Sequence, residues 1–205
     1  MESTKTPAAP GRPRAFCVER ALDRALQVFW QKGYEGASLS ELTQAMGINR
    51  PSLYAAYGNK EELFRKALGR YAQSVEAFLD EHLSRPTARE AVESLFYAVV
   101  DALSCPTNPQ GCMTVRCNLA GTEAAESVRR ELAQQRQRTE VLVRRRLERA
   151  QSEGDLPPGA DPADLARYVA TLQQGMSVQA AGGATHEQLR GVVRTALAAW
   201  PSSTR

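Results

Sequence analysis

The sequence predicts an all-α protein with about nine helices, in which an N-terminal three-helix helix-turn-helix domain precedes a larger helical domain. Three observations support this fold class. Apolar residues recur at helical spacing along most of the chain, and no run alternates apolar and polar residues as a half-buried strand does. A single glycine, Gly47, separates two short helical segments.

Composition is that of an ordinary folded protein and not of a membrane protein. The 205 residues are 42% hydrophobic and 24% charged, enough for one core or for a small and a larger one. No stretch has the roughly 18 uninterrupted apolar residues of a spanning helix, and the N-terminus lacks the apolar run of a secretory signal. We therefore expect a cytoplasmic protein without membrane contact, whose four cysteines are thiols.

Residues 1–15 are expected to form a flexible basic arm that carries Arg12 and Arg14 in the sequence GRPR. Residues 1–70 contain 11 Lys and Arg against 7 Asp and Glu, a balance of +4, whereas the remainder has 15 against 16, a balance of −1. A basic excess at the front suits a polyanionic partner there. We assign residues 16–62 to the helix-turn-helix domain and residues 63–200 to the larger domain.

The helices of the first domain are delimited by local signals. An amphipathic helix begins at Val18 and is expected to stop near Gly33. The sequence SLSE from Ser38 is a capping box that opens a helix over residues 39–46, which Gly47 ends. A third helix opens at residue 49 or 50, with Pro51 in the first turn, where its missing N–H costs nothing.

This third helix has few large apolar residues, which is typical of a helix that enters the DNA major groove. Leu53 would be its inward anchor. Arg50, Ser52, Tyr54 and Ala55 can then face outward, and the small alanine leaves room for a close approach to base edges.

The sequence GRPR, followed by ALDRALQVFWQKGYEGASLSELTQAMGINRPSLYAAYGNKEELFRKAL, resembles the DNA-binding domain of TetR-type transcriptional regulators over about 55 residues. The resemblance combines a G-Y-x-x-x-S-L helix start, an A-x-G-I-x-R-x-S-L-Y recognition helix and a K-E-x-L opening of a fourth helix. Many family members carry histidine and phenylalanine where this chain has Ala56 and Tyr57.

The resemblance implies that Ser38, Tyr54 and Lys60 hold phosphates and that Arg50, Pro51 and Ser52 lie nearest base edges. Two alternatives remain open, because Tyr54 could pack within the domain and Ser38 could serve only as a cap. The expected contacts with double-stranded operator DNA are Arg12, Arg14, Ser38, Arg50, Pro51, Ser52, Tyr54, Tyr57 and Lys60.

The remainder of the chain also has helical periodicity, interrupted by a loop over residues 104–112 that is rich in Pro, Asn and Gly. The resemblance implies an all-α ligand-binding and dimerisation domain. The expected helices span residues 60–82, 91–103, 112–121, 124–153, 162–180 and 187–199.

Polar residues interrupt the apolar stripe of the longest helix at Gln135 and Thr139, which indicates either a ligand pocket or a structural hydrogen bond. The expected ligand-binding residues are Phe96, Val100, Cys112, Cys117, Gln135, Thr139 and Met176. The ligand would be an unidentified small-molecule inducer or an oxidant, and no cofactor is expected.

The last two helices resemble the pair that forms a four-helix dimer interface in TetR-type proteins, although both could instead bury against their own domain. Two helix-turn-helix units about one helical turn of DNA apart are the usual way to lengthen a recognised site. The expected homodimer contacts are Leu165, Tyr168, Leu172, Met176, Leu189, Val193 and Leu197.

Cys112 lies in the sequence PQGCMTVRC, which is similar to a segment of a TetR-type subgroup whose cysteine senses oxidants or electrophiles. A helix N-terminus favours the reactive thiolate, but a free cysteine also commonly acts as a small buried hydrophobe. The spacings of Cys105, Cys112 and Cys117 differ from those of zinc sites, so no metal is expected.

These features predict a DNA-binding transcriptional regulator that responds to a ligand or to redox state, most simply a repressor that binds a palindromic operator as a dimer. No enzymatic motif is present, so we do not expect an enzyme. Two alternatives remain: a thiol-based redox switch or peroxidatic enzyme that uses Cys112, and a basic helical protein that compacts DNA without sequence preference.

Overall fold

The structure, a computed structural model, describes residues 17–106, 108, 109, 111–117 and 123–201, and these form nine α-helices and no strand. The helices are α1 (Val18–Gly36), α2 (Leu39–Met46), α3 (Arg50–Tyr57), α4 (Lys60–Leu83), α5 (Ala88–Ser104), α6 (Met113–Arg116), α7 (Glu123–Ser152), α8 (Pro162–Ala181) and α9 (His186–Ala198). The arm with Arg12 and Arg14 lies outside the described residues.

Capping boxes fix the start of four of these helices, because a side chain at the cap and one three residues later satisfy otherwise free backbone N–H groups. The expected box between Ser38 and Glu41 is confirmed. Thr87 forms a second box with Glu90, so α5 begins three residues earlier than the apolar pattern indicated. The other two boxes open α4 and α9, where they are formed by Asn59 with Glu62 and by Thr185 with Gln188.

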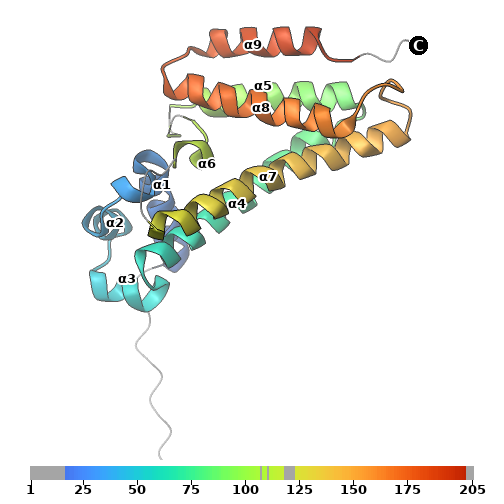
Figure 1. The fold of residues 1–205 in the computed structure, drawn as a ribbon. Coiled ribbons are helices and arrows are strands. Elements are labelled where there is room, and N and C mark those ends of the chain that lie inside the picture. Colours follow the sequence, from blue (N-terminus) through green and yellow to red (C-terminus); the bar gives the residue numbers. More distant parts are fainter. Residues whose placement is uncertain (1–16, 107, 110, 118–122, 202–205) are drawn as a thin grey trace, which may run out of the picture.

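Helices α1 to α3 gather at one end of the molecule, and α4 runs from there along α7 into the body (Figure 1). The core at this end contains Phe29, Leu42, Leu53 and Phe64, all completely buried. Phe29 and Phe64 meet edge to face with their ring centroids 5.0 Å apart. This core holds α3 at the tip of the molecule.

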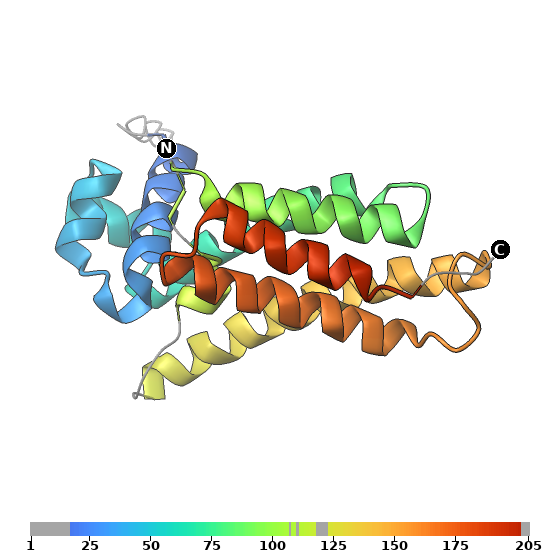
Figure 2. The same cartoon turned by 90° about the horizontal axis from the view of Figure 1, so that it is seen from above.

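The body consists of α5, α7, α8 and α9 together with the distal half of α4 (Figures 1 and 2). Its core includes Leu95, Val143, Leu147 and Val169, each completely buried. The buried Arg146 of α7 donates from Nε to the carbonyl oxygen of Leu83 at 2.9 Å, at the last residue of α4. Its NH2 atom donates to the carbonyl oxygens of Arg85 and Pro86, just beyond that helix.

Besides the start of α5, two helix ends differ by more than two residues from those expected. The backbone of Gly33 has a φ of 73°, a left-handed value that suits glycine, and helical geometry resumes over the next residues to Gly36. The helix expected over residues 112–121 is a short α6 that ends at Arg116, and residues 118–122 lie outside the described part of the chain. Among the described helices, none combines the length and apolar character needed to cross a membrane.

Candidate nucleic-acid interface and ligand cavity

The N-terminal half of α3 is exposed at the tip of the molecule (Figure 1). Asn49 caps the helix by accepting from the backbone N–H of Ser52 at 2.9 Å. Arg50 and Pro51 follow on the exposed surface, and no other described residue bonds to the Arg50 guanidinium. This arginine is free to bind an acceptor outside the protein.

Tyr54 is 49% exposed, whereas Leu53 beside it is completely buried. The outward position of Tyr54 and the inward position of Leu53 are therefore as expected. Tyr57 is a correction, because its ring is only 1% exposed and its hydroxyl donates to the carbonyl oxygen of Val18 at 2.6 Å. Tyr57 lies four residues after the buried Leu53, on the same inward face of the helix, so it cannot reach a phosphate.

Ser38 and Lys60 flank this face, but both also have contacts within the chain. The Ser38 hydroxyl donates to Oε2 of Glu41 at 2.7 Å, which is the capping role considered above. Lys60, at the start of α4, lies over the ring of Tyr34 with Nζ 4.6 Å from the centroid. Burial lowers the pKa of Lys60, and the carboxylate of Glu35 opposes that shift.

An apolar cavity of about 430 Å³ lies where α1, α4, α5, α6, α7 and α8 meet. Such a volume is in the range of small-molecule sites. Its apolar and aromatic lining includes Leu26, Trp30, Tyr71, Val75, Phe78, Leu79, Val99 and Leu103. Its polar lining includes Gln27, Ser74, Asn108, Cys112, Thr114, Gln135, Arg136, Thr139, Gln173, Gln174 and Ser177.

Three of the seven expected ligand residues lie at this cavity, namely Cys112, Gln135 and Thr139. Phe96, Val100 and Met176 do not, because each packs in the core of the body with at most 2% exposure. The helical pattern identified them as inward-facing, but it cannot distinguish a residue that contacts other side chains from one that borders a void.

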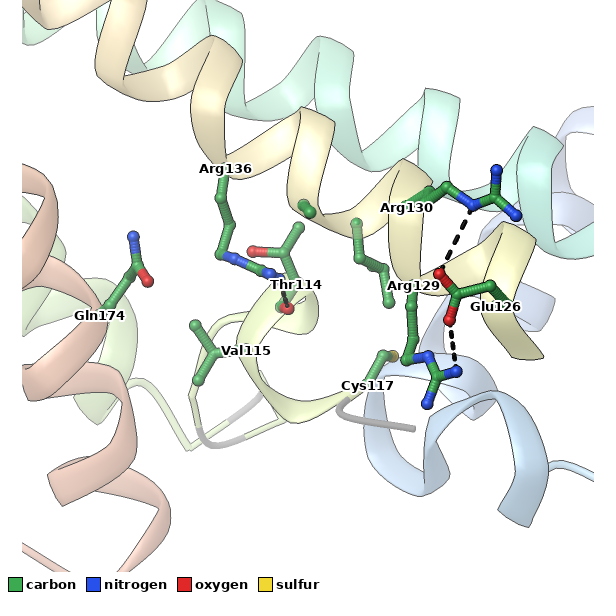
Figure 3. A pocket seen from close by; sticks show the side chains of 10 residues that line it. Thr114, Val115, Cys117, Glu126, Arg129, Arg130, Arg136 and Gln174 are labelled. Atoms are coloured by element: carbon green, nitrogen blue, oxygen red, sulfur yellow. Dashed lines mark hydrogen bonds and ion pairs between the residues drawn. The ribbon is translucent and has the colours of Figure 1, made fainter. Parts of the chain in front are cut away.

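Cys117 is also absent from the apolar cavity. It is 1% exposed, its thiol points to the carbonyl oxygen of Phe29 at 3.5 Å, and burial raises its pKa to about 12. It borders a more open hollow of about 490 Å³ between α6 and α7 (Figure 3). There Glu126 pairs with both Arg129 and Arg130, so these charges largely satisfy one another.

The Cys112 thiol is half-buried at the cavity and contacts two hydroxyl groups. Its Sγ atom lies 3.1 Å from the hydroxyl of Tyr71 and 3.1 Å from that of Thr114. The backbone N–H of Cys112 donates to Oγ of Ser177 on α8 at 2.6 Å. The pKa of Tyr71 is raised well above its usual range, mainly by burial and to a smaller extent by the neighbouring Cys112, so the phenol stays protonated.

Comparison with known proteins decides the family. Residues 21–67 match the family described as bacterial regulatory proteins, tetR family, and residues 88–196 match the tetracyclin repressor-like C-terminal domain. The chain belongs to the TetR family of bacterial transcriptional regulators. The second match alone covers more than half of its length, and the helical architecture described above is that of this family.

Relatives of this TetR-family chain include two repressors of Escherichia coli strain K12. It is 33% identical to the HTH-type transcriptional repressor ComR over 198 residues, which are 93% of this chain and 92% of ComR. It is 32% identical to the HTH-type transcriptional repressor BdcR over 197 residues, which are 92% of this chain and 91% of BdcR. The solved structure of a cysteine mutant of the TetR-family regulator CifR, complexed with a 26 bp double-strand operator DNA, has 45% identity and a TM-score of 0.89, over 93% of this chain and 100% of that one.

The expected dimer residues of this TetR-family chain divide into two groups. Leu189, Val193 and Leu197 are at most 6% exposed and, like Met176, pack in the core of their own chain, so these four are corrections. Leu165 and Leu172 are only partly buried, and Tyr168 is 36% exposed. Two exposed valines outside the expected set of contacts also lie on these helices, Val178 of α8 and Val192 of α9.

The sequence did not allow several residues of the apolar cavity to be predicted as ligand contacts. Trp30, Tyr71 and Phe78 lie on stripes that predict core packing, and only the tertiary arrangement shows that they border a void. Arg136 appeared to be one of many surface arginines on a charged helix. The adjacent interruption at Gln135 was the one available signal for this part of the cavity.

Proposed function

We propose that this chain is a homodimeric transcriptional repressor that binds operator DNA through the exposed start of α3 and releases it when a small molecule enters the apolar cavity. The observation that carries the DNA-binding role is the free, exposed Arg50 guanidinium at the N-terminus of a helix held at the tip of the molecule. An arginine in the major groove can bind guanine through two hydrogen bonds. The relatives named as repressors support the sign of regulation.

The proposed dimer forms through the outward faces of α8 and α9. Tyr168, Val178 and Val192 are three of the four large hydrophobic side chains that the described residues expose, and all three lie on these two helices. Two copies joined there would present two α3 helices to successive major grooves on one side of a palindromic site. Repression is proposed to require no catalytic turnover, and it would take place in the cytoplasm, where operator DNA is found.

The short helix α6 is the proposed link between the cavity and the DNA-binding end. Trp30 and Arg116 connect α6 and the segment before it to α1 through hydrogen bonds of 2.7 and 3.2 Å. Arg136 of α7 and Ser177 of α8 hold the same segment from the body side. A ligand that binds one arrangement of these contacts better than the other would shift the equilibrium between two spacings of the α3 helices.

The experiment that tests DNA binding begins with selection of bound genomic fragments and continues with the Arg50→Ala variant on the selected operator. Loss of one bidentate base contact should weaken binding by about 1–3 kcal/mol, which is about five- to 150-fold, and relax the preference at one base pair of each half-site. Arg144→Ala, on α7 of the body and paired with Glu148 at 3.2 Å, is the matched control and should bind normally. Unchanged affinity and preference in the Arg50 variant would refute the assignment.

We also propose, as a second mode of control, that modification of the Cys112 thiol releases DNA. Its position at the cavity, in contact with the Tyr71 and Thr114 hydroxyls, supports this mode. Treatment with hydrogen peroxide or N-ethylmaleimide should release operator from the wild type and from a Cys17→Ser control, whose cysteine is exposed at the start of α1. Release that persists in Cys112→Ser would reject this mode and leave the non-covalent one.

A further inference from the structure

The apolar cavity has an asymmetric charge. Among the described residues that line it, Arg136 is the one charged side chain, and no carboxylate is present. The other polar groups are neutral amides, hydroxyls and a thiol. A cationic ligand would therefore meet only a like charge in surroundings of low dielectric constant, and this arrangement disfavours cations.

Arg136 differs from its neighbours on α7 because no described carboxylate pairs with it. Arg130 pairs with Glu126, and Arg138 pairs with Glu76 at 3.5 Å. Arg136 instead donates from NH1 to the carbonyl oxygen of Thr114 at 2.6 Å, and its side chain extends from α7 toward α6, with Gln174 of α8 nearby (Figure 3). A partly buried guanidinium without a counter-charge is well suited to bind an anion, which would form charge-assisted hydrogen bonds with it.

Gln135 supplies a second, independent observation. The residue as a whole is 9% exposed and borders the cavity, and its amide forms no hydrogen bond with any described residue but keeps access to the cavity, since it is not among the fully buried atoms without a partner. The amide therefore faces the cavity with a hydrogen bond still to make. The amide N–H₂ of Gln135 can provide that hydrogen bond to an acceptor placed beside Arg136, its neighbour in the chain.

Another part of the cavity lining is apolar and aromatic. Trp30 and Tyr71 meet edge to face with their ring centroids 5.1 Å apart, and Val75 and Phe78 of α4 continue this wall. An aromatic or branched hydrocarbon group placed there would be removed from water on several sides. The cavity therefore combines a hydrocarbon-binding wall with one cationic anchor.

We propose that the inducer is a monocarboxylate with a compact aromatic or branched hydrocarbon body, whose carboxylate binds Arg136 and the Gln135 amide. This inference rests on the proposed function in that it assigns a ligand class to the inducer cavity. Binding would also place a competing acceptor beside the Arg136 to Thr114 hydrogen bond, one of the contacts that hold α6 to the body.

The test is a panel of aromatic and branched carboxylates, including 2-naphthoate, each matched with its own primary amide and with the corresponding amine. Binding to the full-length protein is measured by titration calorimetry, and operator release by fluorescence anisotropy. We expect the ligands that bind and release operator to be carboxylates, at least about tenfold tighter than their amides, with no measurable binding of amines. Sulfonate and phenolate analogues show whether any single anion suffices or a carboxylate is needed; equal or tighter binding of these would overturn the carboxylate assignment.

Arg136→Gln should remove the preference for carboxylate over amide while leaving amide affinity within about twofold. Arg138→Gln is the matched control, since this arginine lies two residues away, does not line the cavity and is 67% exposed; it should retain the preference. If Arg136→Gln fails to fold, the relative affinities of the wild-type protein for carboxylates, amides and amines still test the proposed ligand class. The proposal is overturned if amides or amines bind as tightly as carboxylates, if no carboxylate binds, or if a folded Arg136→Gln keeps the preference.

Operator binding by the ligand-free wild type, measured in the same preparation, separates the two levels of inference. A protein that binds operator but shows no preference for carboxylates would overturn the ligand class and leave the proposed repressor role intact. Absence of operator binding would instead count against the repressor role itself.

Discussion

The indole Nε1 of Trp30 donates a 2.7 Å hydrogen bond to the carbonyl oxygen of Gly111. This bond joins α1 of the DNA-binding end to the segment that precedes α6, and both residues line the apolar cavity. Gly111 has a φ of 86°, and a Cβ atom there would lie 3.1 Å from the carbonyl oxygen of Ser177. Only glycine fits this conformation and this close approach without strain.

Trp30→Phe should retain an aromatic ring against Tyr71 but leave the Gly111 carbonyl without its donor. We expect the free energy of unfolding to fall by about 1–3 kcal/mol, as for other unpaired buried acceptors, and amide hydrogen exchange in α6 to accelerate. Urea denaturation and exchange mass spectrometry measure the two effects. Trp200→Phe, in the core of the body, is the control and should lower stability without exposing α6. Unaltered protection of α6 in the Trp30 variant would contradict a linking role.

Tyr54 and Tyr57 offer a matched pair on one helix. Tyr57→Phe removes the hydrogen bond to Val18 and should lower the free energy of unfolding by about 1–2 kcal/mol. Tyr54→Phe removes an exposed hydroxyl, so stability should remain within about 0.5 kcal/mol while operator affinity declines, through loss of a phosphate contact. Thermal denaturation measures the stability of each variant, and operator titration measures its DNA affinity. A large loss of stability in Tyr54→Phe would indicate that this tyrosine packs instead of binding DNA.

The lowered pKa of Glu41 predicts how the stability of the protein depends on pH. Its hydrogen bonds with Lys32, the largest cause, and with Ser38 lower its pKa from 4.5 to about 2. Between these two values the folded state binds fewer protons than the unfolded state, so the free energy of unfolding rises with pH across this window and this contribution is lost as the pH falls toward 2. Glu41→Gln should flatten the slope, and Lys32→Met should flatten it in part. Urea denaturation at a series of pH values measures it; a slope equal to that of the wild type would disprove the linkage.

Val192 and Val193 are adjacent on α9 but have opposite environments, with exposed fractions of 38% and 1%. Val192→Glu places a charge on the proposed dimer surface and should shift the protein toward monomers without unfolding it. Val193→Glu places the same charge in the core and should destabilise the chain by more than about 3 kcal/mol. Light scattering after size exclusion and chemical denaturation measure both. A Val192→Glu protein that remains fully dimeric would show that the dimer interface does not include this surface.

Local signals in the sequence predicted the helices well because caps and glycine turns act over a few residues. The helix over residues 39–46 has the expected bounds, and the long helix expected over residues 124–153 differs from α7 by one residue at each end. The orientation of Leu53 and Tyr54 also follows from helical periodicity alone. These features depend on neighbouring residues and not on the rest of the fold.

The ligand residues were predicted less well, because a cavity depends on how six helices meet. Phe96 and Gln135 both lie on inward faces, but only Gln135 borders the void. Val193 was assigned to the dimer surface for a related reason: periodicity identified it as apolar and inward-facing, but could not tell whether its neighbour was the same chain or a second copy. Tyr57 was carried over from a DNA-binding motif, although its place in the helix turns it toward Val18.

Arg146 ties the distal end of α4 to α7 through the carbonyl oxygens of Leu83, Arg85 and Pro86, so this end can serve as a pivot. At a rise of about 1.5 Å per residue, Phe78 at the cavity stands only about 7.5 Å from that pivot, whereas Lys60 at the opposite end stands about 35 Å from it. If α4 rotates as a rigid rod, a displacement of Phe78 is magnified between about four- and fivefold at Lys60. The helix then acts as a lever, and a sub-ångström adjustment around a ligand suffices to move the DNA-binding end by a few ångströms.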